Sequence, residues 1–227
     1  WVTERVQTRR KLNISEEDPH SNEQKQSHRL RAKHFVDWLI KKYSIEYLNS
    51  GEGVLDVAGG RGDISFELHT KRGIEATLIE PREMKLRKPQ RKFLKQTSTF
   101  QGNVQGTLWK QVRSILDTKF VESNADLIKN CSIIIGMHPD QATEPIVNTA
   151  LKYGKPFAVV PCCVFGHENG QRQLKDGGSV NQYEEFIQYL LEKENSNFPK
   201  LKIEKDFMNI TGRNQVIFCE PYASAIE

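Results

Sequence analysis

Short apolar runs alternate with longer amphipathic stretches along most of this chain of 227 residues. The short runs are rich in β-branched residues and bounded by turn residues, a pattern typical of buried strands. They lie at 54–57, 74–80, 98–100, 131–135 and 156–160, with two closing strands near 203–210 and 215–219. Apolar residues recur at helical spacing at 27–47, 108–120, 141–153 and 181–194. The alternation predicts an α/β fold: a seven-stranded, mostly parallel sheet with helices on both faces and a C-terminal antiparallel hairpin.

The domain organisation follows from where this periodicity begins. Residues 1–26 are polar and lack the apolar spacing of an independent core, so we expect an N-terminal tail there. Residues 27–222 are expected to form one domain around a single core. Within this domain, residues 166–180 are polar and rich in glycine, which is common in loops that cover a substrate.

The most informative segment is the glycine-rich turn that follows the first predicted strand. Gly59, Gly60 and Gly62 come directly after the strand that contains Asp56, and Asp63 begins a helical pattern. A strand, a glycine turn and a helix N-terminus place backbone N–H groups where α/β sheets bind nucleotides. The spacing does not fit the dinucleotide fingerprint G-x-G-x-x-G, and the Gly-Lys-Ser/Thr of a P-loop is absent.

Two further positions complete a possible adenosine site. Glu80 ends the second strand, about 20 residues after the glycine turn, where a carboxylate can accept hydrogen bonds from ribose hydroxyls. The alternative is a solvated acid at the end of a strand. After the third predicted strand, Asn103 and Val104 are placed to meet an adenine amine, although Gly-Asn is also an ordinary turn dipeptide.

The segment from Asp56 to Gly62 resembles the first motif of class I S-adenosylmethionine-dependent methyltransferases. That motif reads acidic-x-Gly-x-Gly-x-Gly, and Ala58 stands here in the first glycine position. The resemblance implies a Rossmann-like fold and S-adenosyl-L-methionine as the cofactor. The cofactor-binding residues that it implies are Asp56, Ala58, Gly59, Gly60, Gly62, Glu80, Asn103, Val104 and Met137.

The loops after the fourth and fifth strands resemble those of a group of methyltransferases related to the tRNA ribose methyltransferases. That group has H-x-C-G with a nearby Thr in the first loop and a Cys-Cys pair in the second. His138 and the pair Cys162-Cys163 match, whereas Asp140 and Gln141 replace the Cys and Gly. The resemblance covers roughly residues 28 to 220. It does not transfer a substrate, because only these short motifs are specific.

The catalytic residues implied by these loops are His138, Asp140, Cys162 and Cys163. His138 or Asp140 is a candidate base for a hydroxyl acceptor. Asp140 can instead cap the following helix, and the two cysteines can simply pack at the end of a strand. A third interpretation, in which Cys162 attacks a cytosine ring, lacks the second Pro-Cys that such enzymes carry.

The charge distribution adds a candidate partner. The net charge is only +4, yet seven basic residues lie between positions 82 and 95 against one acid, Glu83. Such a stripe can neutralise the phosphates of a nucleic acid, so RNA is a candidate partner; a solvated face is the equally plain alternative. The seven residues are Arg82, Lys85, Arg87, Lys88, Arg91, Lys92 and Lys95.

Composition limits the remaining possibilities. No apolar run approaches the roughly 18 residues needed to span a bilayer. The four cysteines show no zinc-ligand spacing, so no metal site is expected from them, and adjacent Cys162 and Cys163 make a poor structural disulfide. Their apolar surroundings suit a reducing compartment, cytoplasmic or nuclear. The chain starts at Trp1, so we expect a fragment or processed form, and this end does not indicate the compartment.

Three functions remain. The first is a methyltransferase with RNA as one candidate acceptor. The second is a catalytically inactive binding module on the same fold, part of an RNA or protein complex. The third, an oxidoreductase with another adenosine cofactor, is disfavoured by the glycine spacing.

Overall fold

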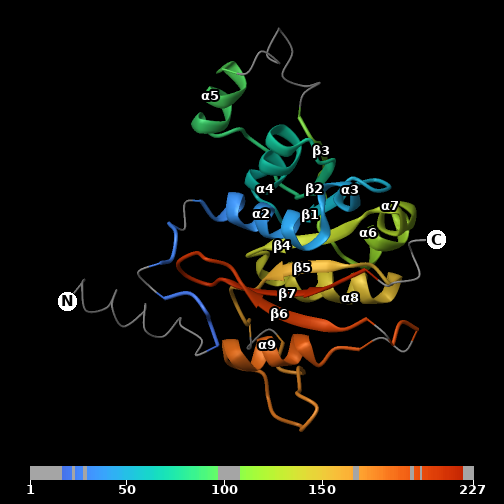
Figure 1. Ribbon diagram of the computed structural model, residues 1–227. Helices are drawn as coiled ribbons and strands as arrows, with labels where there is room; N and C mark the ends of the chain where they lie inside the picture. The colour runs from blue at the N-terminus through green and yellow to red at the C-terminus, as the bar shows by residue number, and fades with distance from the viewer. Residues whose placement is uncertain are drawn as a thin grey trace.

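The computed structural model describes residues 17–21, 24–27, 30–96, 108–165, 169–194, 197–199 and 201–221. They form one seven-stranded sheet in the order β3-β2-β1-β4-β5-β7-β6 (Figure 1). Strands β1 to β5 run parallel to one another, and β7 runs antiparallel to both β5 and β6. This confirms the predicted fold class. The strands are β1 Val54–Val57, β2 Ala76–Ile79, β3 Lys110–Val112, β4 Ile133–Met137, β5 Phe157–Val160, β6 Ile203–Phe207 and β7 Gln215–Cys219.

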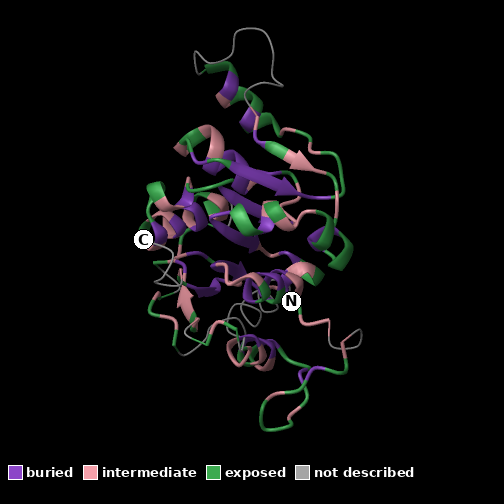
Figure 2. Cartoon of the chain, turned by 90° about the vertical axis from the view of Figure 1, so that its right-hand side faces the viewer, coloured by how far each residue is buried: buried purple, intermediate pink, exposed green. Residues whose placement is uncertain are grey.

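The middle of the sheet is enclosed on both faces. Leu55 of β1 lies opposite Thr77 of β2 on one side and Ile134 of β4 on the other. Every residue of β1, β2 and β5 is buried, whereas the edge strands β3 and β6 are partly exposed (Figure 2). Parallel strands that are covered on both faces are near-continuous apolar runs, which is why their positions are predictable from the sequence.

Helices cover the two faces of the sheet as two separate layers. Successive strand residues point to opposite faces, so Val54 packs in one layer and Leu55 in the other. One layer contains α2 (Arg31–Tyr43), α3 (Ile45–Leu48), α4 (Asp63–Ser65) and the π-helix η2 (Phe66–Lys71). The other contains α6 (Thr118–Ser123), α7 (Ala125–Asn130), α8 (Thr143–Tyr153) and α9 (Tyr183–Leu191). The short 3₁₀-helix η4 (Asp140–Ala142) precedes α8.

One helix prediction is wrong. Within 108–120, Lys110–Val112 pairs with β2 as the edge strand β3. Helix α6 begins only at Thr118, where the Asp117 carboxylate accepts a hydrogen bond from the backbone N–H of Phe120 at 2.8 Å. Ile115, which fits the apolar face of the predicted helix, is 58% exposed. Pairing with a neighbouring strand therefore outweighs the local helical spacing.

The third strand of the sheet lies at 110–112 instead of 98–100. Residues 97–107 lie outside the described residues, and with them the strand predicted at 98–100. Asn103 and Val104 fall in the same segment, so their predicted contacts with the adenine stay predictions. The loop that follows β3 in the sheet consists of residues 113–117.

Part of the predicted tail contacts the C-terminal hairpin. The Lys25 ammonium and the Asp18 carboxylate form an ion pair at 2.6 Å, and their side chains are only 3% and 1% exposed. Asp18 also accepts a hydrogen bond from the Asn214 side chain, and the backbone N–H of Gln26 donates to the carbonyl of Asn209 at 3.1 Å. The division at residue 26 between tail and domain stays a prediction. In the part of the chain that the structure describes, no helix combines the length and apolar character needed to cross a membrane.

Candidate active site

The carboxyl ends of β1, β2 and β4 open into a cleft of about 780 Å³. It lies where the strand order switches between β1 and β4, which is the position that open α/β sheets use for ligands. Two pairs of loops, called walls below, lie at this end of the sheet, and residues 58 and 80–82 of the first and 139–140 of the second line the cleft. The glycine-loop wall consists of the loops after β1 and β2, residues 58–62 and 80–82. The cysteine-loop wall consists of the loops after β4 and β5, residues 138–140 and 161–163.

The glycine loop is held in a left-handed backbone conformation. Ala58, Gly60 and Gly62 have φ values of +54°, +59° and +67°. Ala58 thus stands in a conformation that glycine adopts without cost, which explains why the related motif has a glycine there. At Gly62 a Cβ atom would lie 2.5 Å from the Trp109 ring, whereas at Gly60 it would meet nothing within 4 Å. The backbone at Gly60 therefore faces open space, where a ligand can approach it.

Asp56 lies beneath the glycine loop and is fully buried. Its Oδ2 accepts hydrogen bonds from the hydroxyl of Ser65 at 2.7 Å and from the backbone N–H of Ser65 at 3.2 Å. Its Oδ1 has no partner among the described residues. Burial raises the pKa of Asp56 to about 6, although the bonds from Ser65 act in the opposite direction. Asp56 thus ties β1 to the last residue of α4, and its predicted contact with a cofactor stays a prediction.

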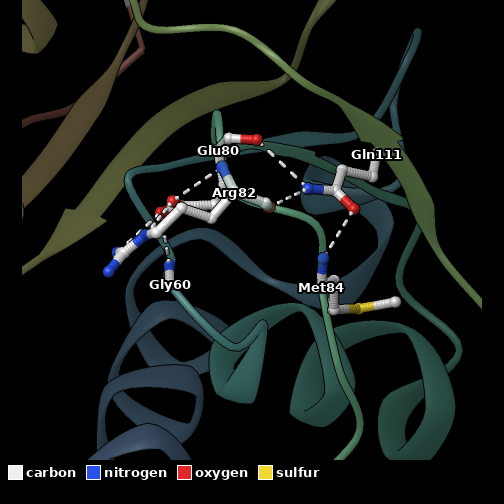
Figure 3. Close-up of polar contacts among 5 residues, drawn as sticks. All are labelled: Gly60, Glu80, Arg82, Met84 and Gln111. Carbon is white, nitrogen blue, oxygen red and sulfur yellow. Dashed lines mark hydrogen bonds and ion pairs between the residues drawn. The ribbon is translucent and has the colours of Figure 1, made fainter.

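Glu80 is a buried carboxylate at the end of β2, only 2% exposed. Its Oε2 accepts a hydrogen bond from the backbone N–H of Gly60 at 3.1 Å, and its Oε1 accepts one from Arg82 Nε at 2.7 Å (Figure 3). Burial by itself raises the pKa of Glu80, but the bonds from Arg82 and Gly60 outweigh burial and hold it below its ordinary value. The strand-end acid is therefore ionised and joined to the glycine loop.

Gln111 fixes the loop that carries Glu80 and Arg82. From β3, its side-chain amide donates to the carbonyl of Glu80 at 3.1 Å and to that of Arg82 at 2.8 Å. Its Oε1 accepts a hydrogen bond from the backbone N–H of Met84 at 3.2 Å (Figure 3). Sequence reasoning missed Gln111 because it placed residues 108–120 in a helix. Arg82 appeared in the sequence only as part of a basic run, and nothing there indicated that it pairs with Glu80.

The cysteine-loop wall brings together residues from two loops. The Cys162 thiol donates a hydrogen bond to Asp140 Oδ1 at 3.0 Å, and the Sγ atom of Cys163 lies within 4.8 Å of both groups. Burial, followed by the bond to Asp140, raises the pKa of Cys162 well above its ordinary value. Cys162 is thus a protonated thiol. The Asp140 carboxylate accepts from Cys162 and not from the backbone of the following helix, which has no side-chain cap.

Backbone contacts hold the cysteine loop in place. The backbone N–H of His138 donates to the carbonyl of Val160 at 3.0 Å, which joins the two loops where they leave β4 and β5. On either side of the cysteines, the carbonyl of Pro161 accepts from the hydroxyl of Tyr183, and that of Val164 accepts from Arg172. The order of the loop therefore depends on residues that sequence reasoning did not select.

Four of the predicted site residues have further features that bear on the site. At Gly59 a Cβ atom would lie 2.6 Å from the Asp56 carboxylate, so this glycine allows the loop to pack on β1. Met137 ends β4 and packs against the apolar cluster under α2. His138 has φ +53° and Asp140 φ +49°, a conformation that residues other than glycine seldom adopt. Among these residues, Ala58, Glu80 and Asp140 line the cleft itself.

The basic run lies beside the glycine-loop wall. Four of its members belong to helix α5 (Lys88–Gln96), and all seven are exposed. Arg82 pairs with Glu80, and Arg87 pairs with Asp63 at 3.1 Å. A groove of about 820 Å³ separates α5 from the start of α2 and from η2. Its lining includes Arg31, Lys33, Lys71, Arg87, Lys92, Phe66 and Phe93.

The groove combines cations with aromatic rings, which the sequence alone does not reveal. The rings of Phe66 and Phe93 meet edge to face with their centroids 5.7 Å apart. Lys71 Nζ lies 5.6 Å and 5.4 Å from the two centroids. Phe66 is distant from the basic run in the sequence and comes close to it only because η2 packs against α5. Phe66 is only 4% exposed, so the half-buried Phe93 is the ring that the groove presents.

Comparisons with known proteins support the fold only in general terms. No protein family matches the sequence, and no curated protein does. Among solved structures, a SAM-dependent methyltransferase from Archaeoglobus fulgidus is 13% identical, with a TM-score of 0.44 over 83% of this chain and 93% of that one. Geranyl diphosphate methyltransferase, solved with SAM, is 12% identical, with a TM-score of 0.45 over 86% and 87%.

An O-methyltransferase family protein from Burkholderia thailandensis is 11% identical, with a TM-score of 0.46 over 84% of this chain and 56% of that one. This chain therefore spans about half the length of that protein. Likeness at this level carries no argument about the reaction or the acceptor. What the structure itself establishes is an open, mostly parallel α/β sheet with a C-terminal antiparallel pair and a cleft at its switch point.

Proposed function

We propose that this chain is an S-adenosylmethionine-dependent methyltransferase. One observation carries the proposal: the buried Glu80 carboxylate accepts a hydrogen bond from the backbone N–H of Gly60 at 3.1 Å. This bond joins the open position of the glycine loop to the strand-end acid, and Glu80 lines the cleft. A carboxylate there can accept the ribose hydroxyls of an adenosyl group, and the left-handed backbone at Gly60 lets the ligand lie against the chain.

The cleft fits a ligand of this kind. Its volume of about 780 Å³ lies within the range of roughly 300–1,000 Å³ typical of small-molecule sites. Glu80 would hold the ribose, and residues 58–62 would lie along the amino-acid part. When bound, S-adenosylmethionine supplies a methyl group on a positively charged sulfur, which leaves the protein mainly the task of orienting the acceptor.

Arg82 has to move for Glu80 to accept a ribose. The Arg82 guanidinium donates to both carboxylate oxygens of Glu80, from Nε to Oε1 at 2.7 Å and from Nη2 to Oε2 at 3.4 Å. The Arg82 side chain is 80% exposed. The guanidinium itself is exposed, so it can turn out to solvent, and ribose hydroxyls would then donate to the buried Glu80 carboxylate in its place. Asp140 on the opposite wall also raises the pKa of Arg82, although less than Glu80 does, and offers the displaced guanidinium a second partner.

The cysteine-loop wall is suited to hold the acceptor. Asp140 lines the cleft opposite Glu80 and is ready to accept a hydrogen bond. A carboxylate in this place can orient an acceptor hydroxyl or amine and take its proton. The protonated Cys162 is a donor to Asp140 and not a thiolate nucleophile. This supports methyl transfer to oxygen or nitrogen over the mechanism in which a cysteine attacks a cytosine ring.

RNA is the acceptor class that the surface supports best. All seven basic residues between 82 and 95 are exposed, Arg82 lines the cleft, and the groove beside α5 presents the half-buried ring of Phe93. Phosphates can bind along such cations while bases stack on rings, without regard to sequence. We therefore propose a single-stranded RNA segment that follows α5 and reaches the cleft.

The cofactor is tested by calorimetry with S-adenosylmethionine and S-adenosylhomocysteine. Gly60→Arg is expected to abolish binding, because the new side chain would enter the open space at the cleft. Gly73→Arg is the matched control: Gly73 has φ +64° and a Cβ atom there also meets nothing within 4 Å, yet it lies in the turn before β2, at the opposite end of that strand from Glu80. Absence of binding by the unmodified protein would refute the proposal.

The acceptor is tested with methyl-labelled cofactor and separated pools of RNA, protein and metabolites. We expect label in the RNA. The triple variant Lys88→Glu, Lys92→Glu, Lys95→Glu should lose RNA binding and its dependence on salt. The triple variant Lys41→Glu, Lys119→Glu, Lys202→Glu makes the same charge change at other exposed positions and should lose much less. Label in the metabolite pool alone would remove RNA as the acceptor.

A catalytically inactive binding module is the second candidate, and the Arg82–Glu80 pair favours it. A permanent ion pair there would close the ribose position. The two candidates differ in one measurement: if neither the unmodified protein nor Arg82→Ala binds S-adenosylhomocysteine, while RNA binding persists, the chain is a binding module.

A further inference from the structure

The cysteine-loop wall holds three side chains that can ligate one metal ion. The Sγ atoms of Cys162 and Cys163 and a carboxylate oxygen of Asp140 all lie within 4.8 Å of one another. We propose that these three residues form a binding site for a thiophilic divalent cation of the zinc class. The sequence does not predict this site, because vicinal cysteines and an acid 22 positions earlier match no known zinc spacing.

The fold brings the ligands together from two loops. Strands β4 and β5 are parallel neighbours, and Met137 pairs with Val160 at their carboxyl ends. The loops that follow therefore leave the sheet side by side, and the backbone bond from His138 to Val160 fixes their separation. Both flanks of the cysteine pair are anchored as well, by Tyr183 at Pro161 and by Arg172 at Val164. A site on an anchored loop needs little ordering when the ion binds.

The distances are close to those of a metal site. Ligands in a tetrahedral zinc site, with bonds of about 2.3 Å to sulfur, lie about 3.8 Å apart. Cys162 Sγ and Asp140 Oδ1 are already 3.0 Å apart, and the remaining separations have to shrink by at most about an ångström. Cys163 and Asp140 are exposed, so their side chains can make this adjustment without disturbing the core.

The ligand set determines the class of ion. Two thiols and one carboxylate suit zinc and similar borderline-soft ions, whereas magnesium and calcium require oxygen ligands. Binding would release the thiol protons of both cysteines to solvent, because thiolates are the ligating form. Three protein ligands leave one coordination position open, as in catalytic zinc sites. Since Asp140 lines the cleft, that position is available to an oxygen, nitrogen or sulfur atom of the acceptor.

The metal site itself does not depend on the proposed function, but the role in holding an acceptor does. The test is a titration of the full chain with cobalt(II), a spectroscopic substitute for zinc, in the presence of a phosphine reductant. Cobalt bound by thiolates gives an intense charge-transfer absorption in the near ultraviolet. We expect this absorption in the unmodified protein, with displacement by zinc and none by magnesium.

The variants assign the ligands. Cys162→Ser and Cys163→Ser should each weaken the absorption and lower cobalt affinity at least tenfold, and Asp140→Asn should lower the affinity with the absorption per bound ion retained. Cys131→Ala, which removes a buried thiol outside the cluster, should leave both unchanged. Circular dichroism verifies folding, and Cys163 is exposed, so at least that variant is expected to fold.

The absence of the absorption, or its persistence in both cysteine-to-serine variants, would overturn the proposal. Calorimetry with S-adenosylhomocysteine on the same samples separates the two proposals. Cofactor binding without cobalt binding refutes only the metal site. Cobalt binding without cofactor binding leaves the metal site standing and refutes the methyltransferase.

Discussion

The two walls of the cleft are built in opposite ways. On the glycine-loop wall, the Glu80 carboxylate and Gln111 join the loops after β1 and β2 through hydrogen bonds that use nearly every polar atom. On the cysteine-loop wall, the Cys162 thiol bonds to Asp140 and to the neighbouring Cys163, and all three side chains are exposed or half-buried. One wall is rigid before any ligand arrives, whereas the other presents groups whose bonding capacity is still available.

This difference indicates a division of labour. A saturated, buried network suits a ligand that is always the same, because its shape can be fixed in advance. Exposed groups on the ends of two loops suit an acceptor or an ion that binds and leaves. The predictions below test this difference between the two walls, in order of decreasing expected effect.

The largest effect is expected at the rigid core of the glycine-loop wall. Gly62→Val would place a Cβ atom 2.5 Å from Trp109 Cζ2 in a backbone with φ +67°. Backbone strain and overpacking together should lower the free energy of unfolding by about 3–5 kcal/mol. Gly73→Val shares the positive φ without the overlap and should lose only about 1–3 kcal/mol in the same urea titration. Equal losses would show that Trp109 does not pack on Gly62.

The second prediction concerns the buried Asp56. Burial raises its pKa from 3.8 to about 6, so the folded state favours the protonated form. The stability that this group contributes is complete below pH 3.8 and is lost as the pH rises through about 6. The difference in unfolding free energy between wild type and Asp56→Asn should therefore fall by about 3 kcal/mol over that window. If the difference in unfolding free energy does not change with pH, Asp56 has its ordinary pKa in the folded protein, and water reaches the carboxylate.

The third prediction concerns the proposed ribose contact. Glu80→Ala removes a charged acceptor of two ligand hydroxyls, so we expect the affinity for S-adenosylhomocysteine to fall about 10–100-fold by calorimetry. Glu83→Ala, an exposed acid three positions later, is the control and should bind normally. Unchanged affinity in Glu80→Ala would place the cofactor away from the glycine-loop wall.

A smaller effect of opposite sign is expected from Arg82→Ala. The exposed guanidinium competes with the ligand for Glu80, so its removal should strengthen cofactor binding by no more than about fivefold. The ionic-strength dependence of the affinity should change as well, because Arg82 is a surface cation. Weaker binding in this variant would assign Arg82 to direct contact with the cofactor.

The smallest effect is expected on the cysteine-loop wall. Cys163→Ala should change the free energy of unfolding by no more than about 0.5 kcal/mol, since the side chain is exposed. The same variant should lower cobalt affinity, as set out above. A large loss of stability would show that this loop is as rigid as the glycine-loop wall, and the contrast between the walls would disappear.

The sequence predicts the central strands of the sheet better than the edge strand β3. β1, β4 and β5 are buried on both faces, and their apolar runs mark them plainly. The short edge strand β3 has only one neighbour and carries polar residues such as Lys110 and Gln111, so its local pattern is ambiguous. The apolar spacing of residues 108–120 therefore predicts a helix there, and it does not predict the hydrogen bonds of Gln111 to Glu80, Arg82 and Met84.

The sequence reveals the glycine loop, the acid at the end of β2, the cysteine pair and the basic run, because each is a local pattern of residue types. Which of them meet becomes visible in the fold: Arg82 with Glu80, Cys162 with Asp140, and Phe66 with the basic helix α5. The physical reason is that such contacts depend on strand order and helix packing, which join residues far apart in the chain and leave no periodic trace along it.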